Sequence, residues 1–181
     1  MNFQFDVKLN DKDYIDFNRF MIIRSPYGKK QIKDFRLTLA VVFFICFLLG
    51  LLVNGVSNDI WFAVVFFVVF SAIVQLLIKP FFSWTVKFSI KTMKKTGKAG
   101  YSPESVLEFG DETFIETTPD NKTEQRYASI ERISIVDNKM IYIHVNNIMA
   151  YILPLSCFET KEQYDEFFEF IKTKSANIDI Y

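Results

Sequence analysis

The chain has 181 residues, enough for one or two small domains, and its 21 Lys and Arg residues balance its 21 Asp and Glu residues. Its two cysteines exclude a disulfide framework, because Cys46 lies in an apolar run and Cys157 lies in the distal region. The first 36 residues are charged and contain no short apolar core, so we expect no signal peptide.

The balanced net charge hides a strong asymmetry along the chain. Residues 1–36 carry eight Lys and Arg and five Asp and Glu, whereas residues 37–78 carry one charged residue, Asp59. Residues 79–100 carry six Lys and no acid, and residues 101–181 carry seven basic and fifteen acidic residues. Basic segments therefore flank an apolar block, a pattern that points to a membrane surface or an acidic partner.

Residues 1–36 are predicted to form a cytoplasmic strand followed by a helix. In residues 3–9 hydrophobic side chains alternate with polar ones, which is a strand pattern. Asn10 is a good N-cap for the helix that follows, and Pro26 is expected to end that helix. The apolar face of the helix would consist of Tyr14, Phe17 and Met21.

Two apolar runs separated by three residues form the predicted transmembrane hairpin of residues 37–78. Residues 37–56 and 60–78 contain no charge and number 20 and 19 residues. As helices, each would reach about 30 Å, the thickness of the hydrocarbon core of a bilayer. Neither run has the polar stripe of a soluble core helix, although two buried helices in a soluble protein are the alternative.

The charges around the hairpin predict a multi-pass protein of the cell membrane with both termini cytoplasmic. Lys and Arg flank both apolar runs and are absent from the connection at residues 57–59. Segments rich in Lys and Arg stay on the cytoplasmic side. We expect Trp61 to anchor the outer interface and Phe82 and Trp84 to anchor the inner one.

Gln75 is a polar residue near the cytoplasmic end of the second run. It can form a hydrogen bond between helices, line a permeation path, or reach the water of the headgroup layer. We favour the last interpretation because of its position. No ionisable residue lies within either run, which argues against a transporter of protons or ions.

Residues 79–100 are predicted to form a basic amphipathic helix and a short linker. Hydrophobic side chains fall on one face, and lysines fall on another within an arc of about 100°. These lysines are Lys87, Lys91, Lys94, Lys95 and Lys98. We expect them to contact anionic lipid headgroups of the inner leaflet, the alternative being that they only set the topology. A nucleic-acid partner is not expected, because the lipid surface would compete for the same charges.

Residues 101–181 are predicted to form a small cytoplasmic α+β domain, an antiparallel sheet capped by a C-terminal helix. Strand patterns separated by turn residues occur at 105–109, 113–118, 140–145 and 149–153, and residues 123–128 and 130–136 give one or two further strands. The last element is a helix that either Thr160 with Gln163 or Ser156 with Glu159 would cap, with an apolar stripe that includes Phe167 and Ile171. The strand and helix of residues 1–36 are candidates to complete the core.

The order of these elements resembles that of the YcxB-like family of bacterial membrane proteins. The resemblance rests on Tyr14, Asp16, Phe17 and Asn18 in the first helix, and on the segments SVLEFGDETFIETT, YASIERISIVDNKMIYIHV and YILPLSCF. It implies a cytoplasmic domain similar to a pleckstrin-homology-like fold. The chain departs from the family at Tyr127-Ala128, where a Trp is common, and at Leu155, where a basic residue often follows the proline. The resemblance implies no established activity.

Two hypotheses of function remain open. The first is a non-enzymatic, membrane-anchored interaction or sensing module that binds a peptide, a protein or a lipid headgroup. The second is an immunity-type membrane protein that protects against a membrane-active toxin or peptide. Its only support is the small size of the chain, the hairpin and the near absence of external surface.

No constellation of catalytic residues is recognisable, so we do not expect an enzyme. His144 is the only histidine and lies in a strand pattern, which favours a hydrogen-bonded structural residue. Cys157 has no second histidine to pair with, and Asp111-Glu112 is more typical of a solvated turn than of an acid–base pair. No metal-ligand spacing occurs, and we expect no cofactor.

Overall fold

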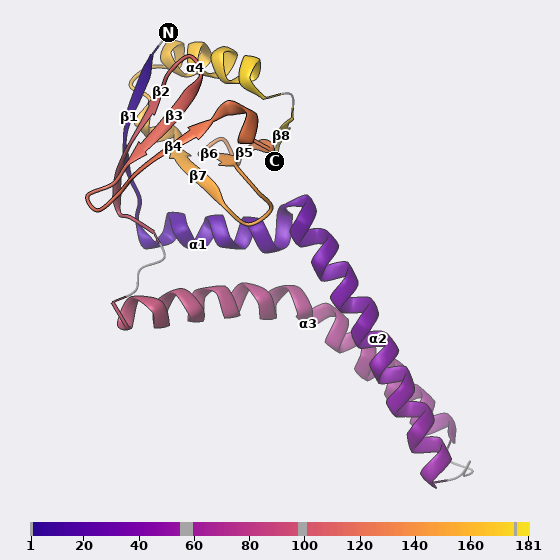
Figure 1. The fold of residues 1–181 in the computed structure, drawn as a ribbon. Coiled ribbons are helices and arrows are strands. Elements are labelled where there is room, and N and C mark those ends of the chain that lie inside the picture. The colour runs from indigo at the N-terminus through magenta and orange to yellow at the C-terminus, as the bar shows by residue number, and fades with distance from the viewer. Residues whose placement is uncertain (1, 55–59, 98–100, 176) are drawn as a thin grey trace. The chain divides into compact units, whose positions relative to one another are not determined.

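The computed structural model of the chain describes residues 2–54, 60–97, 101–175 and 177–181. Two compact units are present in it (Figure 1). Residues 1–14 and 99–181 form the sheet unit, and residues 15–98 form the helical unit. The sheet unit is therefore discontinuous in sequence, because the helical unit is inserted into it after the first strand.

In the described part of the sheet unit, eight strands form two four-stranded sheets, and the helix α4 (Lys161–Lys174) accompanies them. The first sheet has the order β1-β2-β3-β4, with β1 (Phe3–Lys8), β2 (Glu104–Phe109), β3 (Thr113–Thr117) and β4 (Lys122–Arg126). The second has the order β7-β6-β5-β8, with β5 (Arg132–Val136), β6 (Met140–His144), β7 (Ala150–Pro154) and β8 (Ile178–Ile180). Two 3₁₀ turns, η2 (Tyr127–Ser129) and η3 (Leu155–Cys157), follow β4 and β7.

The predicted antiparallel strands and C-terminal helix of residues 101–181 are present, but the strands form two sheets and not one. The turn η2 follows Arg126 and separates β4 from β5, so residues 123–136 contain two strands, one of the two alternatives that the sequence left open. The strand β8 follows α4 and pairs in parallel with β5. A strand of three residues is too short to display an alternating pattern, which is why the sequence did not reveal β8.

The strand β1 precedes the inserted helices in the sequence but pairs with β2, which follows them. It pairs antiparallel with β2 in a register that runs from Phe3 opposite Phe109 to Lys8 opposite Glu104. Phe5 of β1 is buried, whereas the polar residues between its hydrophobic ones are exposed, as the alternation predicted. The N-terminal strand therefore completes the sheet of the distal region.

Buried side chains of both sheets and of α4 form one hydrophobic core. Phe167 of α4 is completely buried, and its ring lies 5.1 Å from that of Phe5 and 4.9 Å from that of Phe109, both in edge contacts. The predicted cap of α4 is confirmed, because the hydroxyl of Thr160 accepts a hydrogen bond from the backbone N–H of Gln163 at 3.1 Å. In Figure 1, α4 covers one end of the strands.

Two short helical elements precede the long helices: α1 (Asp11–Arg19) and a π-helical turn, η1 (Phe20–Arg24). Asn10 caps α1 as predicted, since its side chain accepts a hydrogen bond from the N–H of Asp13 at 3.1 Å. Ser25 interrupts the helical path, and its hydroxyl accepts a hydrogen bond from the N–H of Gly28 at 3.0 Å. A Cβ atom on Gly28 would overlap the backbone carbonyl oxygens of Met21 and Ile22, so this corner requires glycine.

The long helices α2 (Pro26–Asn54) and α3 (Ile60–Lys95) contain the two apolar runs. Pro26 begins α2, so residues 26–36 belong to the same helix as the first run. The second run and the basic segment also form one helix, because α3 continues through Pro80. Figure 1 shows that α3 is bent, and a proline within a helix is a common cause of a bend. Gly97, with a φ of 70°, follows the end of α3. The connection at 57–59 and Gly100 lie outside the described residues.

α2 and α3 pack against each other in opposite directions (Figure 1). Aromatic pairs join them along their length: Phe35 with Phe82, Phe43 with Phe70, and Phe47 with Phe67, at 4.7–5.6 Å between ring centroids. Gln75 donates a hydrogen bond to the carbonyl of Arg36 at 3.3 Å, and the Arg36 guanidinium donates one to the carbonyl of Gln75 at 3.2 Å. The favoured interpretation of Gln75 as an amide directed only to headgroup water was therefore wrong, because it bonds the neighbouring helix.

Replacing Phe167 by Ala is expected to lower the free energy of unfolding of the sheet unit by about 3–5 kcal/mol, because a fully buried ring leaves a cavity. Urea unfolding of the purified chain followed by near-ultraviolet circular dichroism measures this change. The matched control is Glu166→Ala, an exposed neighbour on α4, which is expected to change stability by less than about 0.5 kcal/mol. Equal effects of the two substitutions would contradict the assigned core.

Candidate functional site

The last four turns of α3 present a buried face and a basic face. Val86 and Ile90 are buried, at 7% and 9% exposure. The lysines of the basic face are exposed: Lys87, Lys91, Lys94 and Lys95. The predicted amphipathic pattern is therefore present along this segment, although its apolar face is covered in the folded chain. Lys98, the fifth predicted lysine, lies outside the described residues.

A third face of this segment carries exposed aromatic side chains. Phe81, Trp84 and Phe88 are 55%, 59% and 59% exposed, and their neighbouring rings lie 6.4 Å and 5.6 Å apart. At 100° per residue these three positions lie beside Lys91 and Lys95 on the helix. The sequence prediction included Trp84 but missed Phe81 and Phe88. These lie three residues before and four residues after Trp84, a spacing that places all three side chains on neighbouring positions of a helix.

The other two predicted interface anchors differ in their surroundings. Trp61, in the first turn of α3, is exposed. Phe82 is half-buried, and its ring packs edge-on against that of Phe35 on α2. Phe82 therefore contributes to the packing of the two helices, whereas Trp84 and its aromatic neighbours point outward.

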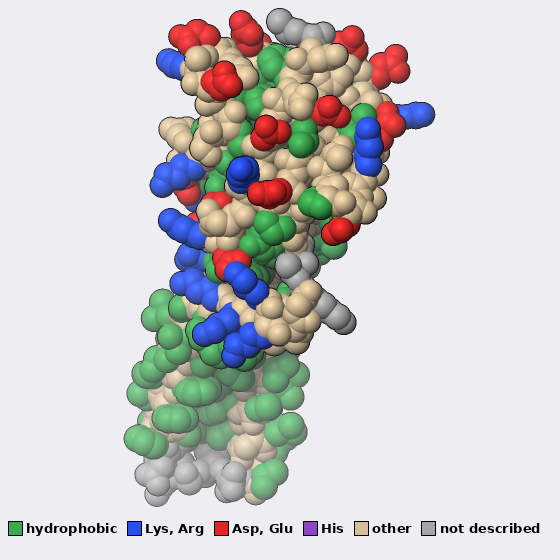
Figure 2. Space-filling model, turned by 90° about the vertical axis from the view of Figure 1, so that its left-hand side faces the viewer, with side chains coloured by type: hydrophobic (Ala, Val, Ile, Leu, Met, Phe, Trp, Pro, Cys, Tyr) green, Lys and Arg blue, Asp and Glu red, His purple; other side chains and the backbone are tan. Residues whose placement is uncertain are grey.

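Most of the described surface of the two apolar runs is exposed. α2 and α3 each contain an 18-residue window, long and apolar enough to cross a membrane, in which no residue is buried. Even large side chains such as Val53 and Leu76 are exposed. Figure 2 shows hydrophobic side chains covering this part of the helical unit, with Lys and Arg side chains gathered beside one end of it.

An open pocket of about 420 Å³ lies in the helical unit where the end of α1 and η1 meet the middle of α3. Three cations line it together with uncharged residues. The lining residues are Arg19, Ile23, Lys79, Pro80, Ser83, Trp84 and Lys87. Arg19 lies 3.8 Å from Asp16, and its buried Nε atom has no hydrogen-bond partner. The sequence analysis placed Lys87 and Trp84 near a membrane surface but did not join them to Arg19, since the two segments are distant in sequence.

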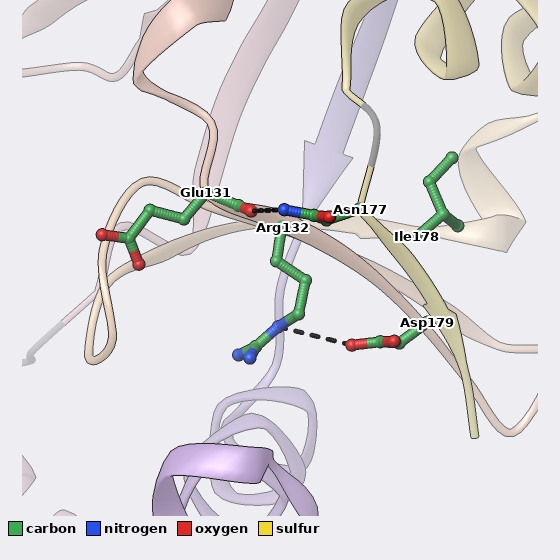
Figure 3. Close-up of a pocket in the computed structure, with 5 residues that line it drawn as sticks. All are labelled: Glu131, Arg132, Asn177, Ile178 and Asp179. Atoms are coloured by element: carbon green, nitrogen blue, oxygen red, sulfur yellow. Dashed lines mark hydrogen bonds and ion pairs between the residues drawn. The ribbon is translucent and has the colours of Figure 1, made fainter.

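A second open pocket, of about 390 Å³, lies in the sheet unit where β8 meets β5 (Figure 3). Arg132 and Asp179 point toward each other across it, with 3.8 Å between the Arg132 Nε and an Asp179 carboxylate oxygen. The side-chain amide of Asn177 donates a hydrogen bond to the Glu131 carbonyl at 3.1 Å. Ile178 completes the lining. The one cation of this pocket is thus accompanied by two acids, and these contacts hold β8 on the sheet.

The titratable side chains considered in the sequence analysis do not line either pocket. His144 is buried and shares a 3.1 Å hydrogen bond with the Ser134 hydroxyl. Burial lowers the pKa of His144 to about 4, with a smaller contribution from the charge of Arg132. Cys157 is half-buried and donates a hydrogen bond to the Asp6 carbonyl at 3.4 Å, and burial raises its pKa. Among the described residues, no group of three or more His, Cys, Asp or Glu is placed to hold a metal ion.

Comparison with known proteins gives a match to one family model. Residues 109–171, which run from the end of β2 through most of α4, match the model described as YcxB-like protein. No curated protein and no solved structure matches the chain. The match covers the strands and the helix that supply most of the core of the sheet unit. The resemblance to the YcxB-like family seen in the sequence is thereby confirmed over residues 109–171.

Proposed function

We propose that this chain is a non-enzymatic, membrane-anchored module that holds the sheet unit at the cytoplasmic face of the cell membrane. The helices α2 and α3 cross the bilayer as a hairpin, and the sheet unit binds a peptide, a protein or a lipid headgroup there. The basic and aromatic faces of α3 contact anionic lipid of the inner leaflet.

The exposed surface of α2 and α3 is the observation that carries this proposal. No residue in either 18-residue apolar window is buried within the chain. Each exposed Val, Leu or Phe side chain would gain about 1.5–3 kcal/mol on leaving water. The apolar face of a core helix in a soluble protein is buried inside the protein, whereas the apolar windows of α2 and α3 remain exposed. Hydrocarbon supplies the missing apolar surroundings.

The pairing of β1 with β2 supports a hairpin topology independently of charge. These strands precede and follow the two long helices, and they lie side by side in one sheet. Both ends of the helical pair must then lie on the same side of a membrane. The lysines that follow the second apolar run favour the cytoplasmic side.

The fold of the sheet unit supports a binding role. Two small sheets with a helix over one end are compatible with the pleckstrin-homology-like fold that the family resemblance implies, and sheet edges are places where extended peptides bind. The strand β4 forms one edge of the first sheet, and its residues are exposed or half-exposed. A cytoplasmic or membrane protein that presents an extended segment is the partner that suits this edge.

The environment of His144 supports a structural role and thereby the non-enzymatic part of the proposal. A catalytic base needs a pKa near the working pH and access to a substrate. His144 is buried at 1% exposure, and its pKa of about 4 keeps the ring neutral at pH 7. Its hydrogen bond to Ser134 joins neighbouring strands β6 and β5.

The proposed topology is tested by cysteine labelling in a Cys46→Ala, Cys157→Ala background. In intact cells, a membrane-impermeant maleimide should modify Asn58→Cys in the outer connection but leave Lys122→Cys unmodified. Lys122→Cys should react once the cells are permeabilised, and both cysteines should react in detergent, which controls for reactivity. Modification of Lys122→Cys in intact cells, or a monodisperse full-length chain in buffer without detergent, would refute the proposal.

The structural role of His144 predicts a pH dependence of stability. Because the folded pKa of about 4 lies below the ordinary value of 6.5, the stabilisation is complete above pH 6.5 and is lost as the pH falls toward 4. The native chain should lose about 3 kcal/mol of unfolding free energy relative to His144→Gln over this range. Urea unfolding at several pH values measures the difference, and parallel curves for the two chains would contradict a buried neutral histidine.

A further inference from the structure

We propose that the pocket lined by Arg19, Lys79 and Lys87 binds the phosphate of an anionic phospholipid. The inference rests on the proposed function, because it requires α3 to span the bilayer. It adds a defined lipid site, with residues from two segments, to the diffuse contact expected of the lysines on α3.

The charge of the pocket is the first argument for an anionic ligand. Three cations line it, and its lining contains no Asp or Glu. Within the described part of the chain, neither Lys79 nor Lys87 forms a hydrogen bond or an ion pair. Three cations around a pocket that no acid lines repel one another, and a phosphate between them would attract all three.

Arg19 gives the pocket a donor suited to phosphate. Its nearest acid is Asp16, at 3.8 Å, which is too long for a hydrogen bond. Its Nε atom is buried and has no partner, which leaves a donor unsatisfied. The planar guanidinium presents paired N–H groups that match two oxygens of a phosphate, so a ligand placed there would satisfy Arg19 and neutralise the lysines together.

The pocket of Figure 3 serves as an internal comparison. Arg132 also has a buried Nε atom without a hydrogen-bond partner, but Asp179 and Glu131 line the same pocket. The two acids outnumber the one cation, so an added anion would be repelled. Of these two pockets, the one in the helical unit has three cations in a lining free of acids.

The position of the pocket along α3 identifies the source of the phosphate. Lys79 is the first residue after the apolar run of residues 60–78. In a bilayer the lipid phosphates lie directly beyond the hydrocarbon core, at the level where Lys79 would emerge. Trp84 and Ile23 add apolar surface to the lining. A phospholipid would therefore place its phosphate among the cations and its acyl chains along the exposed apolar surface of α3.

The test uses Trp84 as a reporter of the lipid that occupies the pocket. The chain has two tryptophans, so Trp61→Phe leaves Trp84 as the only one. This full-length variant is placed in vesicles of phosphatidylcholine and phosphatidylglycerol, in which one lipid at a time carries bromine on its acyl chains. The quenching of Trp84 by brominated phosphatidylglycerol, compared with that by brominated phosphatidylcholine, gives the preference for phosphatidylglycerol beside the pocket. We expect this preference to exceed about tenfold, as two cation contacts of about 1 kcal/mol each would give.

Substitutions separate the pocket from the general basic surface. Lys87→Gln and Arg19→Gln should each lower the preference about fivefold, whereas Lys87→Arg should retain it. Lys91→Gln and Lys95→Gln, on the same helix but outside the pocket, are the matched controls and should keep the preference within about twofold. Circular dichroism checks that each variant is folded. If Arg19→Gln does not fold, the result for Lys87→Gln decides the test.

Each contrary result has a defined meaning. Equal quenching by the two lipids in the parent chain, or an equal loss of preference in Lys91→Gln and Lys87→Gln, would overturn the pocket but leave the membrane anchor in place. Loss of the preference on adding excess inorganic phosphate at constant ionic strength would assign the pocket to free phosphate and overturn the lipid proposal. Absence of quenching by either lipid would refute the membrane anchor, and the pocket proposal with it.

Discussion

The antiparallel ladder between β1 and β2 connects the two ends of the inserted helical unit. Closing a flexible loop of this length would cost about 4 kcal/mol in chain entropy. Burial of Phe5 and Val7 offsets this by about 3–6 kcal/mol, before any contribution from the hydrogen bonds of the ladder. The pairing can therefore hold both ends of the helical unit together, and Tyr101 adds a 2.7 Å hydrogen bond to Asp11 beside them.

This constraint connects the fold to the proposed function. A sheet that includes the segments on both sides of the helical pair requires an even number of membrane crossings between β1 and β2. Two exposed apolar helices meet that requirement. The basic part of α3 then follows the second crossing, with Trp84 and the lysines on its outer faces. Sheet pairing, hydrophobic exposure and charge thus favour the same topology for independent physical reasons.

Much of this architecture was predictable because it depends on local patterns. The lengths of the apolar runs, the caps at Asn10 and Thr160 and the lysine face of α3 each follow from spacing within one segment. The features that were missed depend on segments distant in sequence. The hydrogen bonds between Gln75 and Arg36 and the position of Arg19 beside Lys79 arise only when helices pack. The sequence left open whether Pro80 ends the second helix or kinks it, because a proline within a helix and one at its start have similar sequence surroundings, and α3 continues through it.

Disulfide formation across β1 and β2 tests the central constraint most directly. Gln4 lies opposite Glu108 in the ladder, and both side chains are outside the core. In a chain without native cysteines and kept in its membrane, Gln4→Cys with Glu108→Cys should form a disulfide under mild oxidation. Gln4→Cys with Glu104→Cys, which is out of register by four residues, should not. Equal cross-linking of the two pairs, or none in either, would contradict a sheet that closes across the inserted helices.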